Sequence, residues 1–486
     1  MKGNTLHVLV FAAAFAALVS PAAAQSDEDL FGAPETVEEA ADAAEIDRSE
    51  FLEWDAPRVS GWLSGSLGFS WTWLDPWAFE SAMYDDYAMN PALSSRLTLQ
   101  AKPAADWGYY AALDLSYPFT TTATGSSVVH WDHDSDPMTP DAEASESSTV
   151  DGIPNISIYA LYANFSWDDA LFFSFGKQPL RLGVGRFFQP ADDLVSLSEI
   201  DVSDPEAERE GPLAFTALWP IPRTLSSVAL WTVFPKGAEK PEDIMYAAKA
   251  KHFFGDTELS LAAAYKYDAP PSAFLMLNSG LWDLNVFGEA QLKYGSERTF
   301  LESDEATPLT VLMLGSSAFE AVEYPDRFFA SATLGASYLN QETNLTVMAQ
   351  YLFNGEAQSE ATAAEAFNHF FLQTALQETG SFTDPVAFAL DTLRFSRHYA
   401  AASVSLGELF GAEDLSASLT AMANLSDLSG FAMPQLSYRF FDYLSASLSA
   451  RFTFGEEGDE FTMGPTGPGK PSASVSLSIT VGSGSF

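Results

Sequence analysis

Residues 471–482, Pro-Ser-Ala-Ser-Val-Ser-Leu-Ser-Ile-Thr-Val-Gly, alternate apolar and hydroxyl-bearing side chains along most of their length. Residues 443–454 repeat the pattern, with leucine, alanine and phenylalanine on one face and serine, arginine and threonine on the other. Successive side chains of a β-strand point to opposite faces, so each segment predicts a strand with one apolar and one polar face. A strand that separates lipid from water sustains such alternation over about 9–11 residues. The pattern therefore predicts an all-β fold, a transmembrane antiparallel β-barrel.

The first 24 residues predict a signal peptide and not a structural element. Lys2 precedes an apolar run over residues 8–19, and three alanines at 22–24 offer a cleavage site. Beyond this segment no run approaches the ~18 apolar residues that a spanning helix needs. We therefore expect an exported chain in the bacterial outer membrane, with the barrel over residues 58–486. The acidic segment 25–57 between them is interpreted as a periplasmic tail or, alternatively, as a plug or partner-binding helix.

The composition narrows the classes of function. The formal net charge of −43 makes nucleic acid an unsuitable partner. The absence of cysteine excludes disulfides, thiolate metal sites and cysteine nucleophiles. A hydrophobic content of 47% argues against disorder of the whole chain. Much of the acid instead falls between the predicted strands, which predicts long acidic extracellular loops at 75–90, 130–151, 192–210, 302–326, 355–391 and 456–460.

Turn parity gives a count of strands. In such barrels the turns on the periplasmic side are short, so connections between successive short turns must be the longer, outward ones. Short turns are read at 103–106, 167–169, 220–222, 255–256, 295–296, 340–342, 407–414 and 441–442. Parity then demands a weak strand near 298–304 and gives eighteen strands, with sixteen as the alternative. They are expected to start near 59, 91, 107, 155, 170, 211, 224, 243, 257, 281, 298, 327, 344, 395, 414, 431, 443 and 472.

The phase of each strand predicts which charged side chains line the lumen. A charge that faces lipid costs roughly 2–4 kcal/mol at the bilayer midplane, so lysine and arginine in a strand should point inward. The expected basic lining is Arg96, Lys102, Lys249, Lys251, Lys266, Lys293, Arg397, Arg439 and Arg451. The expected acidic lining is Asp114, Glu258, Asp283 and Glu289. This basic excess favours either a path for anions or a wall braced by ion pairs with carboxylates of the lumen and of inward-folding loops.

Residues 175–193 carry a motif, in which Gly-Lys-Gln at 176–178 precedes Gly183, Gly185, Phe188, Pro190 and Asp192. This order resembles a pattern in porin-like bacterial outer-membrane β-barrel proteins, although this chain has Leu182 where the pattern often has tryptophan. The resemblance implies a loop folded into the lumen that narrows a channel. The alternative is an external loop with surface ion pairs. The expected constriction residues are Lys177, Arg181, Arg186, Asp192 and Asp193.

These features predict an outer-membrane porin for passive diffusion of small hydrophilic solutes, since barrels of 16–18 strands leave an aqueous channel. The alternatives are a structural or adhesion barrel whose outer loops bind ligands, and a hydrophobic-substrate transporter plugged by the N-terminal segment. No catalytic constellation, metal site or cofactor is expected. Besides small solutes, the expected partners are outer-membrane lipids and the barrel assembly machinery, which would recognise the C-terminal Phe486.

Overall fold

The computed structural model of this chain describes twelve stretches of sequence. They are residues 57–74, 76, 86–104, 106–118, 155–168, 170–196, 205, 209–303, 319–358, 396–456, 459–462 and 470–482. The predicted signal peptide, nearly all of the acidic segment 25–57, most of the acidic loops and Phe486 lie outside these residues. Within them, no helix is long and apolar enough to cross a membrane.

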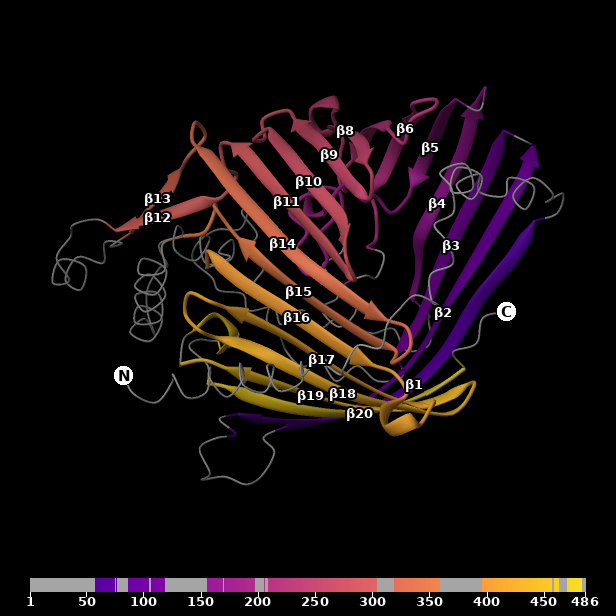
Figure 1. The fold of residues 1–486 in the computed structure, drawn as a ribbon, viewed down its shortest axis with the longest axis vertical. Helices are drawn as coiled ribbons and strands as arrows, with labels where there is room; N and C mark the ends of the chain where they lie inside the picture. The colour runs from indigo at the N-terminus through magenta and orange to yellow at the C-terminus, as the bar shows by residue number, and fades with distance from the viewer. Residues whose placement is uncertain are drawn as a thin grey trace, which may run out of the picture. The chain divides into compact units, whose positions relative to one another are not determined.

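Eighteen strands form one closed antiparallel barrel (Figure 1), as the alternation predicted. Their bounds are β1 Arg58–Leu74, β2 Asp86–Ala104, β3 Trp107–Pro118, β4 Asn155–Trp167, β5 Leu171–Lys177, β6 Leu213–Pro220, β7 Ser227–Phe234, β8 Met245–Phe254, β9 Thr257–Lys266, β10 Ser272–Leu281, β11 Leu284–Tyr294, β14 Phe328–Asn340, β15 Leu345–Phe353, β16 His398–Leu406, β17 Leu415–Asn424, β18 Gly430–Phe441, β19 Leu444–Phe454 and β20 Ser472–Val481. The short strands β12 (Thr299–Ser303) and β13 (Phe319–Glu323) pair only with each other, as a hairpin outside the barrel wall (Figure 1).

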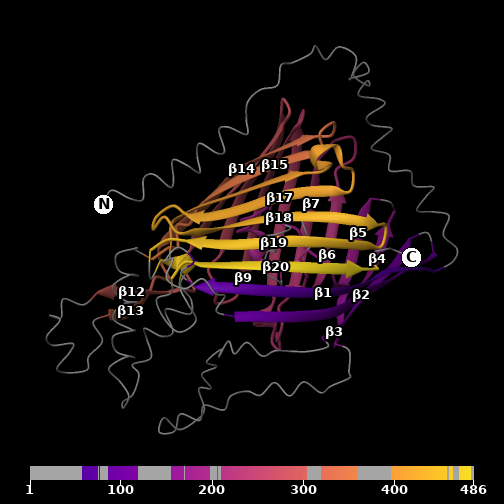
Figure 2. The same ribbon diagram turned by 90° about the horizontal axis from the view of Figure 1, so that it is seen from below.

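The ring closes between the first and last strands. Each strand pairs with its neighbour along the chain, except that β11 pairs with β14 across the hairpin and β20 pairs with β1. Figure 2 shows β20 lying directly beside β1. The register places Leu67 opposite Ile479 and Phe69 opposite Leu477, so the apolar faces of the two strands coincide. Closure therefore leaves no unpaired strand edge, which a bilayer would not tolerate.

The two rims of the barrel differ in the length of their connections. One rim carries the two-residue connections after β2, β8, β10 and β18, and the other carries longer loops such as 178–212, 295–327 and 354–397. We call them the short-turn rim and the long-loop rim. All but one of the predicted short turns lie at the short-turn rim. The exception is the turn predicted at 295–296, which lies at the long-loop rim because β11 runs in the opposite direction from the one assumed.

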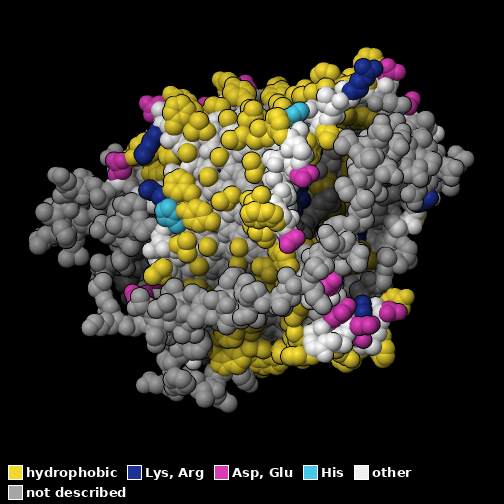
Figure 3. Space-filling model, viewed as in Figure 1, with side chains coloured by type: hydrophobic (Ala, Val, Ile, Leu, Met, Phe, Trp, Pro, Cys, Tyr) yellow, Lys and Arg dark blue, Asp and Glu magenta, His cyan; other side chains and the backbone are white. Residues whose placement is uncertain are grey.

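Apolar side chains cover the outside of the barrel. Leu230, Leu261 and Leu334 are more than half exposed, although each sits in the middle of its strand. Figure 3 shows hydrophobic side chains spread over the visible wall, with charged ones mainly toward the edges. An apolar band of this kind matches the hydrocarbon core of a membrane. The outer face is therefore the bilayer-facing one, and the eighteen strands of the barrel span the membrane.

The predicted number of strands was right, but one assignment was wrong. Seventeen predicted strands correspond to strands of the barrel; the eighteenth, near 298–304, is β12 in the separate hairpin. The strand that was missed is β10, which has apolar side chains on both faces. Leu275 and Leu277 face outward, whereas Phe274 and Met276 are buried on the inner face. The alternation that reveals the other strands is therefore absent here.

A charge placed on the outer face should destabilise the barrel. Leu261→Arg puts a guanidinium into hydrocarbon near the middle of β9, at an expected cost of roughly 2–4 kcal/mol. Ser476→Arg, in the middle of β20 on the lumen face, is the matched control and should cost much less. Urea unfolding of the refolded protein in lipid vesicles measures both changes. Equal losses of stability would contradict the assignment of the two faces.

Candidate functional site

A long connection of the chain folds into the barrel. It joins β5 to β6, and its entry and exit lie side by side because the backbone N–H of Gln178 donates to Pro212 O at 3.2 Å. The Gln178 side chain adds a hydrogen bond from Nε2 to Ala214 O, also at 3.2 Å. We call residues 178–196, the described first part of this connection, the inward loop.

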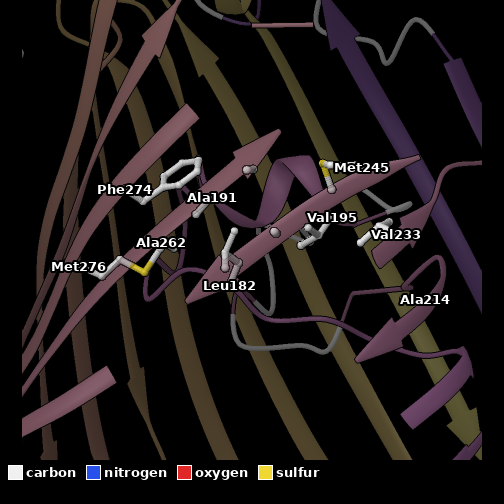
Figure 4. Packing of buried hydrophobic residues seen from close by; sticks show 11 residues of the cluster. Leu182, Ala191, Val195, Ala214, Val233, Met245, Ala262, Phe274 and Met276 are labelled. Carbon is white, nitrogen blue, oxygen red and sulfur yellow. The ribbon is translucent and has the colours of Figure 1, made fainter. Parts of the chain in front are cut away.

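Apolar side chains anchor the inward loop to the lumen wall. Leu182, Ala191 and Val195 are buried against the inner faces of β6 to β10 (Figure 4). Further along the loop, Phe187 packs against Phe287 of β11 in a second buried cluster. Fully burying a side chain such as leucine or phenylalanine stabilises by about 1.5–3 kcal/mol. The inner wall is apolar on this side because the inward loop covers it.

Two buried carboxylates accept hydrogen bonds from the backbone of the loop. Asp192 Oδ1 accepts from the N–H groups of Leu182 and Gly183, the latter at 2.7 Å. Glu289 of β11 accepts from the N–H of Val184 at 3.0 Å and of Ala191 at 3.2 Å. Buried N–H groups without acceptors would be costly, so these carboxylates allow an irregular segment to lie inside the barrel.

The two glycines of the motif have steric roles. A Cβ added at Gly183 would lie 2.5 Å from Glu289 Oε2, and one added at Gly185 would lie 2.0 Å from Phe188 O. Gly183 thus admits the carboxylate, and Gly185 permits the tight bend that follows it. The motif itself gives no sign of the carboxylate on β11 that requires glycine at position 183.

Gln350 of β15 fixes the middle of the inward loop. Its Oε1 accepts from the backbone N–H groups of Arg186, Phe187 and Phe188 at 3.0, 2.8 and 3.3 Å. Its Nε2 donates to Phe188 O at 2.8 Å and to Thr333 Oγ1 at 2.6 Å. Across the loop, Lys249 Nζ of β8 donates to Leu182 O at 2.8 Å. Strands far apart in sequence therefore hold the loop from several sides.

The predicted constriction residues all lie in or beside the inward loop. Lys177, at the end of β5, forms an ion pair with Glu210. Asp193 forms one with Arg209 at 2.9 Å. Arg181 is exposed, whereas the half-buried Arg186 lies 5.8 Å from the ring centre of Phe287. Asp192 accepts hydrogen bonds from the backbone N–H groups of Leu182 and Gly183.

Four of the basic side chains predicted to line the lumen are ion-paired. Arg96 binds Asp114 through two hydrogen bonds, Nε to Oδ1 at 2.6 Å and Nη2 to Oδ2 at 2.8 Å. The other three pairs are Lys251–Glu258 at 3.7 Å, Lys293–Glu356 at 2.8 Å and Arg439–Asp414 at 3.0 Å. Glu356 belongs to the long connection after β15, so an acidic loop does supply one of the partners. Part of the basic excess therefore braces the barrel.

The remaining predicted positions divide into strand and non-strand residues. Lys102, Lys249, Lys266 and Arg451 lie in strands, and the Arg451 guanidinium sits 4.5 Å from the ring centre of Phe431. Arg397 is exposed and lies just before β16. The strand placement predicted for Asp283 was wrong, because this residue lies exposed in the two-residue turn between β10 and β11. Glu289 is on the inner face but holds the loop and is buried beneath it.

A second segment packs near the inward loop and was not predicted. It is the short 3₁₀ turn η4 (Glu460–Thr462) between β19 and β20. The Tyr399 hydroxyl of β16 donates to the Glu460 carboxylate at 2.7 Å, and Asn424 Nδ2 of β17 donates to it at 2.9 Å. Phe188 of the inward loop lies 6.2 Å from Tyr399, ring centre to ring centre. Burial raises the pKa of Glu460 to about 7.

The geometry defines a class of protein, a membrane-spanning barrel of eighteen strands with an internal loop fixed to one side of its lumen. No protein-family model and no curated protein match the chain. Among solved structures it is similar to OpdK of Pseudomonas aeruginosa with vanillate, at 9% identity over 88% of this chain and 99% of that one, with a TM-score of 0.46. It is also similar to OccK2 (OpdF) of the same organism in complex with glucuronate, at 9% identity over 88% and 98%, TM-score 0.44. OccAB1 of Acinetobacter baumannii gives 13% identity over 87% and 96%, TM-score 0.45.

Removing the Gln350 amide should release the inward loop. In Gln350→Leu, three backbone N–H groups lose their acceptor, at roughly 1–3 kcal/mol for each donor left buried. We expect hydrogen exchange at residues 186–188 to accelerate at least tenfold. Gln350→Glu retains acceptor oxygens and should keep most of the protection. Native-like exchange in the leucine variant would show that Gln350 does not hold the loop.

The contact of η4 with the wall should weaken as the pH rises. Folded Glu460 keeps its proton up to about pH 7, against 4.5 for an ordinary glutamate. Between these values the folded state binds more protons than the unfolded one, so stability falls with increasing pH and levels off above 7. Hydrogen exchange of residues 459–462, corrected for intrinsic rates, should therefore show more protection at pH 5 than at pH 8.

Glu460→Gln should abolish this pH dependence, since the amide cannot ionise. The control is Glu413→Gln, which changes an exposed glutamate at the short-turn rim and should preserve the dependence. If the glutamine variant at position 460 kept the full pH response, another group, such as Asp459, whose pKa is raised by burial, would have to be its origin.

Proposed function

We propose that this protein is an outer-membrane pore that admits small hydrophilic solutes by passive diffusion. The observation that carries the proposal is the inward loop itself. It is bound to the wall of β6–β11 and β14–β16, and a barrel of eighteen strands is wide enough to enclose an aqueous channel. A loop fixed in this way narrows the lumen from one side and sets the size of solute that passes.

The strands opposite the inward loop support a wet path. On β20 the lumen face carries Ser474, Ser476 and Ser478, and the register sets Ser70 opposite Ser476 and Gly68 opposite Ser478. These serine and glycine residues are too small to fill the lumen, and they do not make it apolar. An adhesion barrel would not require such a face, and a transporter for hydrophobic molecules would favour apolar side chains there. The hydrophilic pore is therefore the stronger proposal.

The expected environment follows from the same features. The apolar outer band suits outer-membrane lipids, the long-loop rim is assigned to the outside of the cell, and both ends of the barrel lie at the opposite, short-turn rim. Recognition of Phe486 by the assembly machinery belongs to this proposal. So does a tail or plug role for residues 25–57, whose deletion alters conductance only if they plug the pore. No catalytic step or cofactor is part of it.

Charge preference is proposed to rest on a smaller set of side chains than the composition indicates. Four predicted lumen cations are ion-paired, and Lys249 is bound to the inward loop. Arg181 and Arg451 are exposed, and they are the best candidates for attracting anions electrostatically. We therefore expect a modest preference for anions and not a strict one.

Conductance of the refolded mature chain in a planar bilayer tests the proposal. We expect steady single-channel currents, and a reversal potential in a salt gradient that indicates anions. Arg181→Gln combined with Arg451→Gln should lower the anion-to-cation permeability ratio about two- to threefold, which corresponds to about 0.4–0.7 kcal/mol. Lys236→Gln, at an exposed site of the long-loop rim, is the control and should leave the ratio unchanged.

A correctly folded barrel without conductance would refute the pore. Conductance with an unchanged permeability ratio in the double variant would leave the pore standing but transfer its selectivity to other side chains.

A further inference from the structure

The lumen face of β1–β4 carries large flat side chains that the pore proposal does not use. The register places Trp62 of β1 opposite Arg96 of β2, and Arg96 opposite Asp114 of β3. Residues directly opposite on paired strands share a face, so the tryptophan and the ion pair lie together on the lumen side. The neighbouring Leu97 and Leu99 point the other way and are exposed on the outer face.

A β-bulge adds a tyrosine to this group. In the pairing of β3 with β4, Ala112 lies opposite Ala160 and the next residue, Leu113, lies opposite Ile158, so the register skips Tyr159. Ile158 and Leu161 are exposed on the outer face, whereas Ala160 is fully buried. With strict alternation Tyr159 would point into lipid. The bulge instead places its ring under Arg96, whose guanidinium carbon is 3.6 Å from the ring centre. Bulges often re-aim a side chain in this way.

The Arg96 ion pair makes this part of the lumen nearly neutral. Asp114 binds the guanidinium edge through two hydrogen bonds, and Tyr159 covers one of its faces. The arginine and aspartate side chains nevertheless remain 29% and 32% exposed. The lumen is lined here by a flat guanidinium and, on the neighbouring strand, by the indole of Trp62, which is 37% exposed. Such a surface suits stacking better than the attraction of a free anion.

A second pair of rings continues the surface toward the short-turn rim. Tyr110 of β3 and Tyr162 of β4 are directly opposite each other and stack, with ring centres 5.0 Å apart and planes inclined by 23°. They lie four residues along β3 from Asp114, roughly 14 Å away. Between the two groups Ala112 and Ala160 are fully buried, so neither presents a surface to the lumen. We call Trp62, Arg96, Tyr110, Tyr159 and Tyr162 the aromatic stripe.

We propose that the aromatic stripe is a binding subsite for solutes that have a flat face, on their way through the pore. The shared chemistry is stacking of a ring on tyrosine, tryptophan and guanidinium faces, which either an aromatic ring or a pyranose can supply. The proposal rests on the pore function, because the stripe lies in the lumen. With such a subsite, the shape of a solute as well as its charge determines whether it is bound and passes through the pore.

Equilibrium binding to the refolded protein in detergent tests the subsite separately from conductance. Isothermal titration calorimetry compares benzoate with cyclohexanecarboxylate, which has the same charge and a similar size but no aromatic face. A second arm compares glucose with sorbitol, its open-chain counterpart. We expect the flat member of at least one pair to bind about fivefold more tightly. The arm that shows the preference identifies the kind of ring.

Matched variants connect that preference to the stripe. Tyr159→Leu combined with Tyr162→Leu removes two faces and should bring the affinity ratio close to one. Tyr159→Phe combined with Tyr162→Phe keeps both rings and should retain it. Circular dichroism and the unfolding midpoint verify that each barrel is folded, and single variants replace any double variant that is not.

Equal affinities within both pairs in the native protein would overturn the subsite, as would a ratio that survives the leucine substitutions. The two proposals fail in different ways. A conducting barrel without ring preference would refute only the subsite. Ring-selective binding by a barrel that does not conduct would refute the pore, and with it the passage of the bound solute, but would leave the aromatic stripe as a binding site.

Discussion

The whole structure depends on the pairing of backbone hydrogen-bonding groups, because the hydrocarbon core of a membrane contains no donors or acceptors for them. In hydrocarbon every backbone N–H and C=O must find its partner in the protein, and a sheet achieves this only when its first and last strands pair. Here β20 meets β1 with apolar facing apolar and serine facing serine. Closure fixes the two faces of every other strand, because a slip of one residue would exchange lipid-facing and lumen-facing side chains all around the ring.

The same requirement shapes the inward loop. An irregular segment inside the barrel has backbone N–H groups that no strand pairs. In the inward loop, Asp192, Glu289 and Gln350 accept hydrogen bonds from the N–H groups of residues 182–184, 186–188 and 191. These acceptors are fixed on β11, on β15 and within the loop itself. Apolar packing of Leu182 and Phe187 supplies adhesion, but the polar acceptors determine where the backbone can lie.

Sequence reasoning found the barrel because most strands have chemically different faces, and it failed where the faces are alike. In β10 the inner Phe274 and Met276 are as apolar as the outer Leu275 and Leu277, since the inward loop covers the inner face. Turn parity then demands one further strand, and the prediction places it near 298–304, in the segment that forms β12. The count was right because the two errors cancelled. Gln350 could not be found either, since one glutamine in a strand does not indicate which loop it will meet.

Charge counting shows a similar limit, and it bears on function. Basic side chains in the lumen make the channel basic only where no acidic side chain pairs with them. Arg96 is an example, because Asp114 pairs with the edge of its guanidinium and the Tyr159 ring covers one of its faces. The β-bulge that brings Tyr159 to this position cannot be recognised from an alternation of apolar and polar residues. A residue that composition assigns to anion attraction thereby becomes part of a flat, nearly neutral surface. The selectivity of this lumen therefore depends on which charges are paired and on the shape of the surface that these pairs leave exposed.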